Sequence, residues 1–112
     1  MTRVVFTRTA DGLISALDIR GHAGYGAAGE DIICAAITSA IQLTHILLED
    51  ILELDFDTRV EQESTYIHLF FPADVREAAQ DAMEALRLHY REMQESYSKF
   101  LTVLEVYSDA EN

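Results

Sequence analysis

The feature that most constrains the fold is one long helical pattern that lies between two pairs of strand-like segments. From about residue 31 to 52, apolar residues recur at spacings of three and four, from Ile33 through Ile37 to Ile51. This is the period of an α-helix with one buried face. The apolar stripe is wide, as expected for a helix that packs against a sheet. We therefore expect the segments on either side to form that sheet.

The flanking segments have the composition and alternation of β-strands. The first two are separated by Asp11-Gly12, a common two-residue hairpin turn. The next two are separated by Gln62-Glu63-Ser64 and form a second predicted hairpin. A last strand precedes a polar tail. The predicted strands span 3–9, 13–20, 56–61, 65–71 and 100–107.

A second helical pattern follows Pro72, with an apolar stripe over 75–97. Asp74 and Glu77 resemble a capping box at its start. The element order is therefore ββαββαβ, in a single domain of residues 1–112. Because hairpins pair strands antiparallel, we expect an α+β fold: a two-layer α/β sandwich, with a mostly antiparallel sheet and two helices on one face.

The charge balance narrows the partners that the protein can bind. The chain has 20 acidic residues against 8 lysines and arginines, a formal net charge of −12. Nucleic-acid binding depends on neutralising phosphates, so we expect neither a DNA or RNA partner nor an anionic membrane surface. A basic partner would be attracted over long range. The alternative is that the charge only keeps a small protein soluble.

The sequence also has few features of an exported protein. A single cysteine cannot form an internal disulfide, so the fold does not depend on an oxidising compartment. Residues 1–6 lack the apolar core of a signal peptide. We expect no apolar run to approach the roughly 20 residues that span a membrane. These observations predict a cytoplasmic protein.

The single cysteine, Cys34, lies near the start of the long helical pattern and follows a glycine-rich loop. Unpaired backbone N–H groups at a helix start favour a thiolate and can hold an oxyanion. The loop has the backbone freedom to admit and cover a substrate. We therefore expect a thiol nucleophile; an inert, buried cysteine is the alternative. The glycines of the loop are Gly21, Gly24, Gly26 and Gly29.

His22 lies at the far end of this loop, where its imidazole could take or hold the proton of the thiol. Asp31 is the nearest carboxylate that could orient the imidazole, and it could equally cap the helix. Glu30 and Asp31 oppose thiolate formation, so the outcome depends on where His22 lies. His22 is otherwise an ordinary loop histidine. The remaining histidines have the pattern of surface or core residues; they are His45, His68 and His89.

The same residues could in principle bind a metal. His22, Asp31 and Cys34 are types that zinc accepts. Their spacing matches no short zinc motif, and there is no second cysteine, so we expect neither a metal nor another cofactor. The glycine-rich loop also lacks the Gly-Lys-Ser/Thr ending of a phosphate-binding loop.

The run Gly21-His22-Ala23, followed after a variable stretch by Asp31-Ile32-Ile33-Cys34-Ala35-Ala36, resembles the signature of the ribosomal-processing cysteine protease family, Prp. The resemblance extends over nearly the whole chain in length and element order. It implies a cytoplasmic, homodimeric bacterial protease. Such a protease removes a short N-terminal extension from a large-subunit ribosomal protein by cutting after a phenylalanine, a step that ribosome assembly needs.

The resemblance also assigns roles to residues. It implies that His22 is the catalytic histidine, Cys34 the nucleophile, Asp31 a supporting residue and 23–30 a segment that gates the site. Thr38 stands where many members have serine, and it keeps the hydroxyl group.

Two further expectations concern the partners of the chain. A sheet covered on one side leaves Tyr66 and Phe70 on its open face, which could serve as a homodimer surface. The alternative to a protease is a small acidic dimeric module that binds a basic ribosomal protein without cutting it.

Overall fold

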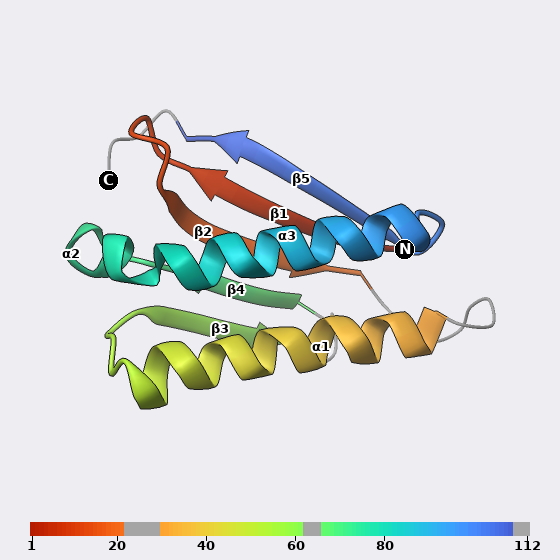
Figure 1. Ribbon diagram of the computed structural model, residues 1–112, viewed down its shortest axis with the longest axis horizontal. Coiled ribbons are helices and arrows are strands. Elements are labelled where there is room, and N and C mark those ends of the chain that lie inside the picture. Colours follow the sequence, from red (N-terminus) through yellow and green to blue (C-terminus); the bar gives the residue numbers. More distant parts are fainter. Residues whose placement is uncertain (22–29, 62–65, 109–112) are drawn as a thin grey trace.

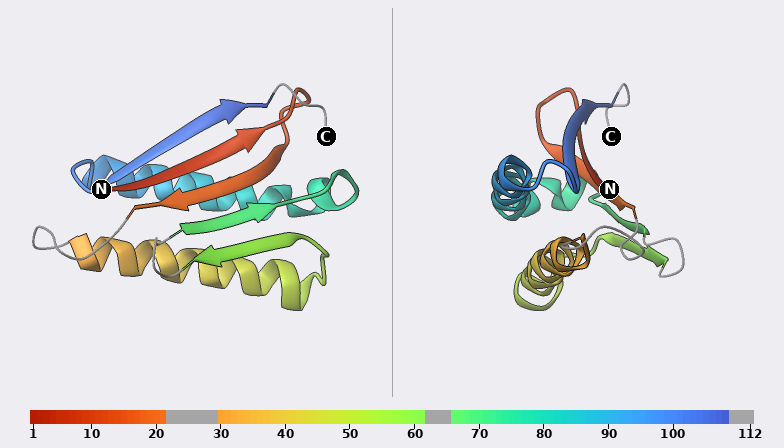
Figure 2. Two further views of the ribbon diagram at one scale, coloured as in Figure 1. Left: turned by 180° about the vertical axis from the view of Figure 1, so that it is seen from behind. Right: turned by 90° about the vertical axis from the view of Figure 1, so that its right-hand side faces the viewer.

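The computed structural model describes residues 1–21, 30–61 and 66–108, with the backbone alone for residues 30 and 31. Two long helices, α1 and α3, cover one face of a five-stranded mixed sheet (Figure 1). The end-on view in Figure 2 shows both helices on the same side of the sheet. The predicted two-layer fold is confirmed. The strands are β1 (Thr2–Arg8), β2 (Ile14–Arg20), β3 (Asp57–Glu61), β4 (Tyr66–Phe70) and β5 (Leu101–Tyr107); the helical elements are α1 (Glu30–Ile46), η1 (Leu47–Ile51), α2 (Ala73–Arg76), η2 (Glu77–Ala79) and α3 (Gln80–Ser96).

The sheet has the strand order β3-β4-β2-β1-β5. The β1–β2, β2–β4 and β3–β4 pairs are antiparallel, as the hairpin signals predict. Only β1 and β5 are parallel, because α3 carries the chain back before β5 begins. The N-terminus and the start of α1 therefore lie at the same end of the molecule (Figure 1 and Figure 2).

The core fills the space between the helices and the covered face of the sheet. The Tyr90 hydroxyl on α3 donates a hydrogen bond of 2.7 Å to the backbone carbonyl of Ile37 on α1, so a buried polar group joins the two helices. Burial raises the pKa of Tyr90 above its ordinary value. The largest fully buried side chains are Val4, Phe6, Ile14, Leu17, Ile37, Leu48, Leu69, Phe71, Met83, Tyr90 and Leu101.

The helix boundaries correct three sequence-based expectations. α1 begins at Glu30, so Asp31 lies inside its first turn rather than at the cap. The second helical segment is capped by Pro72 without a side-chain hydrogen bond, so the capping box at Asp74 was wrong. Tyr97 was expected on the buried stripe but is 45% exposed, because α3 ends at Ser96 and the chain turns away there.

The first helix ends in a π-helical turn, η1, which shifts its buried stripe. A π-turn holds more residues than an α-turn, so it rotates the residues that follow. Leu48 is fully buried, whereas Ile51, expected on the same stripe, is 67% exposed. Each residue of a π-turn rotates less about the helix axis than in an α-helix, so Ile51 no longer falls on the buried stripe.

The expectation that no apolar run approaches the length of a membrane span was wrong. Among the described residues, the helical run Ile32–Ile51 is long and apolar enough to cross a membrane by length and composition alone. The core helix of a soluble protein can pass the same test, but only 22% of this run is buried. Much of the exposed surface of α1 is therefore apolar.

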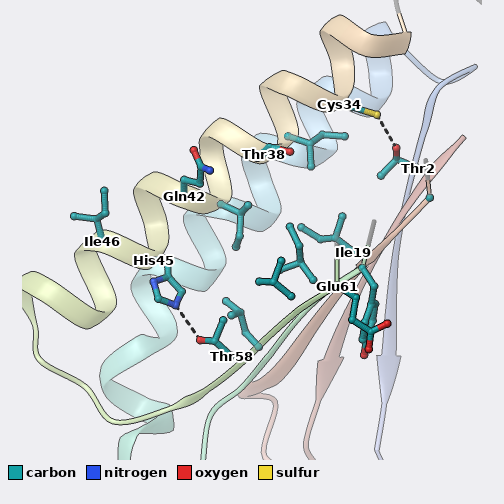
Figure 3. Close-up of a pocket in the computed structure, with 16 residues that line it drawn as sticks. Thr2, Ile19, Cys34, Thr38, Gln42, His45, Ile46, Thr58 and Glu61 are labelled. Carbon is teal, nitrogen blue, oxygen red and sulfur yellow. Dashed lines mark hydrogen bonds between the residues drawn. The ribbon is translucent and has the colours of Figure 1, made fainter. Parts of the chain in front are cut away.

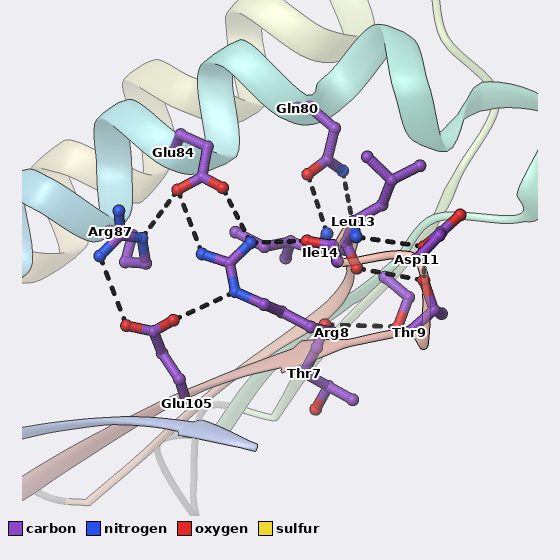
Figure 4. Close-up of polar contacts among 12 residues, drawn as sticks. Thr7, Arg8, Thr9, Asp11, Leu13, Ile14, Gln80, Glu84, Arg87 and Glu105 are labelled. Atoms are coloured by element: carbon purple, nitrogen blue, oxygen red, sulfur yellow. Dashed lines mark hydrogen bonds and ion pairs between the residues drawn. The ribbon is translucent and has the colours of Figure 1, made fainter. Parts of the chain in front are cut away.

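A network of ion pairs ties β1 and β5 to α3 (Figure 4). The Arg8 guanidinium lies 2.9 Å from a carboxylate oxygen of Glu84 on α3 and 3.1 Å from one of Glu105 on β5. Arg87 adds a contact of 2.8 Å to Glu84. The hydrogen bond from Arg8 lowers the pKa of Glu84 below its ordinary value. Distant segments of the chain are thereby held together at the β5 edge.

Candidate active site

A groove of about 650 Å³ runs between α1 and the side of the sheet formed by β3 and β4 (Figure 3). One wall comes from a single face of α1 and the other from the strands. Most of the lining is aliphatic, which makes the groove suited to apolar groups. The aliphatic lining residues are Ile19, Ile37, Ile41, Ile46, Val60, Ile67 and Leu69.

Cys34 lies at one end of this groove and is half-buried. Its Sγ is 3.4 Å from the Oγ1 of Thr2, the first residue of β1 (Figure 3). Thr2 is only 4% exposed, so this hydroxyl reaches the sulfur from inside the protein. Its backbone N–H donates to the carbonyl of Phe100 at 2.9 Å, which fixes the strand end next to the thiol.

Cys34 lies about two residues further into the helix than its sequence context suggested. With α1 starting at Glu30, Cys34 is the fifth residue of the helix. The N–H groups that lack intrahelical partners belong to the four residues before it. The positive end of the helix dipole acts mainly within the first turn, so its effect on the sulfur is weaker than expected.

The face of α1 that carries Cys34 continues along the groove with Thr38, Gln42 and His45. Thr38, expected to support the site, lines the same groove one turn after the cysteine. His45 Nε2 lies 2.9 Å from Thr58 Oγ1 on β3 and closes the far end (Figure 3). Eleven residues of helix place His45 about 16 Å along the axis from Cys34. His45 is therefore too far away to exchange a proton with the thiol.

Gly21 holds the end of β2 against the N-terminus beside Cys34. Its φ is +130°, and a Cβ there would lie 2.4 Å from the Met1 carbonyl oxygen and 2.7 Å from the Thr2 Cα. Only glycine permits this approach. Gly21 lines the groove, and it directly precedes His22 in the chain.

Several expected site residues lie outside the described residues. These are His22, Gly24, Gly26 and Gly29; of Asp31 only the backbone is described. The pairing of His22 with Cys34 therefore stays a prediction, as does the role of Asp31. Among the residues that the structure does describe, no three His, Cys, Asp or Glu side chains are grouped to hold a metal ion.

Two groove residues were missed by the sequence reasoning. His45 recurs with Cys34 and Thr38 at helical spacing, so a helical projection centred on the cysteine could have placed it on the same face. Thr2 carries no comparable signal, since it is 32 residues from Cys34 and meets it only through the sheet.

The family described as cysteine protease Prp matches residues 1–102 of this sequence. The chain belongs to this family. Cys34 is the one cysteine in the sequence, and it lies at the end of the groove. No curated protein matches the sequence.

Solved structures of bacterial proteins share this fold. The protein SMU.848 from Streptococcus mutans has a TM-score of 0.86 at 22% identity, and the match covers 96% of this chain and 99% of that one. The essential ribosomal processing protease Prp from S. aureus, in complex with a substrate peptide, has a TM-score of 0.86 at 17% identity, covering 94% and 99%. The same S. aureus protease with a covalently linked product peptide has a TM-score of 0.82 at 18% identity, with the same coverage.

Proposed function

We propose that this member of the Prp family is an endopeptidase that removes an N-terminal extension from a large-subunit ribosomal protein by cutting after phenylalanine. The observation that carries the proposal is Cys34, the single cysteine of a cysteine protease family member, at the end of an apolar groove. The S. aureus protease of the same fold has been solved with a substrate peptide and with a covalently linked product peptide. No cofactor is needed for this reaction.

In the proposed mechanism, the thiolate of Cys34 attacks the scissile carbonyl carbon and a C–S bond forms. The C–N bond then breaks, and His22 protonates the leaving amine. Water, activated by His22, hydrolyses the acyl-enzyme and restores the thiol. The backbone N–H groups of the first turn of α1 stabilise the oxyanion.

The support for His22 is its place in the chain. It follows Gly21, which lines the groove and packs against Met1 and Thr2, and consecutive Cα atoms are about 3.8 Å apart. This connection in the chain supports the assignment of His22 as the partner of Cys34. We assign Asp31, in the first turn of α1, to orient the imidazole, and the glycine-rich loop to gate the site.

The groove indicates how the substrate is held. An extended peptide advances about 3.3 Å per residue, so the ~16 Å between Cys34 and His45 accommodates about five residues. The aliphatic walls favour apolar residues there, including a phenylalanine next to the scissile bond. The net charge of −12 would attract the basic body of a ribosomal protein. The reaction would take place in the cytoplasm, by a homodimer.

Intact-mass analysis of an extended ribosomal protein incubated with this chain tests the proposal. Wild-type protein should release the extension, and Cys34→Ala should not. His22→Ala should slow both trimming and iodoacetamide labelling of Cys34, while His45→Ala should raise KM without abolishing kcat. A folded wild-type protein that binds the substrate but leaves its mass unchanged would favour the non-catalytic acidic module.

A further inference from the structure

The far end of the groove differs in chemistry from its aliphatic walls. There His45 on α1 and Thr58 on β3 meet across the groove, with His45 Nε2 2.9 Å from Thr58 Oγ1 (Figure 3). Gln42 lies three residues before His45 on α1 and also lines the groove. We call these three side chains the polar end of the groove. A peptide in the groove meets apolar walls first and polar groups only here.

The imidazole of His45 is held in place by its neighbours. Its ring meets the Phe56 ring edge-on, with the centroids 5.2 Å apart and the planes at 63°. Phe56 in turn packs on the fully buried Phe71, with ring centroids 5.1 Å apart. Together with the contact to Thr58, this packing restricts the orientation of the ring. A side chain that is already ordered suits recognition, because it loses little conformational entropy when a ligand binds.

The polar end has hydrogen-bonding capacity that the chain itself does not use. A histidine ring has two nitrogens, and within the described residues only Nε2 of His45 has a hydrogen-bond partner. The exposed amide of Gln42 makes no hydrogen bond within the same part of the chain. The Nδ1 of His45 and the Gln42 amide are therefore available to a ligand.

The chemistry of these groups favours a ligand that can both donate and accept a hydrogen bond. If the Thr58 hydroxyl donates to Nε2, the Nδ1 of His45 carries the proton and donates; if Nε2 donates, Nδ1 accepts. The Gln42 amide also offers a donor and an acceptor. A side-chain amide, as in asparagine, can bond to the polar end in either case. A leucine has a similar shape and can do neither.

Carboxylates near the polar end disfavour an anionic ligand. Residues 49–57, which connect α1 to β3, contain five acidic residues and no lysine or arginine. All five are exposed, and the last of them directly precedes Thr58. A carboxylate on the ligand would be repelled at this end, so an aspartate would be a poor substitute for asparagine. The five are Glu49, Asp50, Glu53, Asp55 and Asp57.

The distance from Cys34 indicates which substrate residue reaches the polar end. In the proposed function, the scissile bond lies at Cys34 and follows a phenylalanine, which the aliphatic walls favour. The residues upstream of the scissile bond therefore lie along the groove. The polar end is about 16 Å from Cys34, and an extended peptide advances about 3.3 Å per residue. The fifth residue upstream of the scissile bond lies at this distance.

We propose that the polar end of the groove is a specificity subsite that selects a side-chain amide about five residues upstream of the scissile bond. The proposal rests on the proposed function and adds a second point of selection to the phenylalanine. His45 and Thr58 lie too far from the sulfur to act on the reacting bond. Exchange of the amide for leucine should weaken binding about tenfold, through the loss of its hydrogen bonds.

Peptide binding to the full-length Cys34→Ala variant, measured by fluorescence anisotropy, tests the subsite without cleavage. Three peptides contain phenylalanine before the scissile bond and differ only at the fifth upstream residue, which is asparagine, leucine or aspartate. We expect the asparagine peptide to bind about tenfold more tightly than either of the others.

His45→Gln, added to Cys34→Ala, separates recognition from a structural role. Glutamine can still bond to Thr58 but lacks the second ring nitrogen, so the preference for asparagine should fall to about twofold or less while Tm is unchanged. His89→Gln is the matched control, because His89 is exposed on α3 outside the groove, and it should keep the full preference.

Three results would overturn the subsite: a chain that binds none of the peptides, one that binds asparagine and leucine peptides equally, or a preference that His45→Gln leaves intact. A preference for asparagine at the fifth downstream residue would also overturn it, since the other side of the substrate would then occupy the groove. Trimming is measured separately with Cys34 present. Selective binding without trimming would count against the proposed function alone, and trimming without selectivity would count against the subsite alone.

Discussion

Substitution of Gly21 by alanine should be far more damaging than the same change at Gly12, although both glycines have positive φ. At Gly21 the new Cβ would lie 2.4 Å from the Met1 carbonyl oxygen, where real Cβ contacts are longer than 3.0 Å. At Gly12, with φ +89°, a Cβ would meet nothing within 4 Å. The two variants therefore share the strain of an unfavourable φ, and only Gly21→Ala adds a backbone clash.

The expected losses of stability follow from two effects, the unfavourable φ and the backbone clash. An alanine held in a sparsely populated φ region costs about 1–3 kcal/mol of unfolding free energy. Overpacking against a backbone that cannot move freely adds about 1–3 kcal/mol. We expect Gly12→Ala to lose about 1–3 kcal/mol and Gly21→Ala about 2–6 kcal/mol, with the loss at Gly21 larger by about 1–3 kcal/mol. The glycine of the hairpin turn thus serves as the control for the glycine of the site.

Urea denaturation followed by circular dichroism measures both losses, with the midpoint and slope compared for the two variants. Gly21→Ala should also slow trimming more than Gly12→Ala, because the displaced N-terminus carries Thr2 away from Cys34. Equal losses of stability at the two positions would refute the argument that the close approach at Met1, rather than φ, makes Gly21 necessary.

Two further predictions address the thiol and the ion-pair network. Thr2→Val removes the hydroxyl 3.4 Å from the sulfur and should lower kcat for trimming about tenfold with little change in KM or Tm; an unchanged kcat would remove Thr2 from the mechanism. Because Arg8 lowers the pKa of Glu84, this carboxylate stabilises the fold above its ordinary pKa of 4.5 and loses that contribution as the pH falls below it. Glu84→Gln should therefore be less stable than wild type at pH 7, and urea melts should show the difference shrinking toward pH 3; parallel curves would contradict this reasoning.

Local sequence patterns were sufficient to predict the secondary-structure elements and the fold class. Strand alternation and helix periodicity depend on residues close in sequence, and these predicted all five strands and both long helices within a few residues. The same patterns did not predict where the helices end or which residues cap them. Pro72 took the cap position expected of Asp74, and the π-turn exposed Ile51, because ends depend on how the chain meets the rest of the molecule.

The sequence by itself determined the chemistry that the chain can offer: one cysteine, a histidine across a glycine-rich loop, and a family signature that joins them. Only the tertiary structure decided what surrounds the thiol. Thr2 reaches Cys34 across 32 residues, and Thr58 meets His45 at the far end of the groove. One side of α1 stays exposed, with Ile32 and Leu43 on it, because the sheet and α3 pack on its other sides. These contacts between distant residues depend on strand register and on how the helices pack on the sheet. Neither can be read from the spacing of residues along the chain.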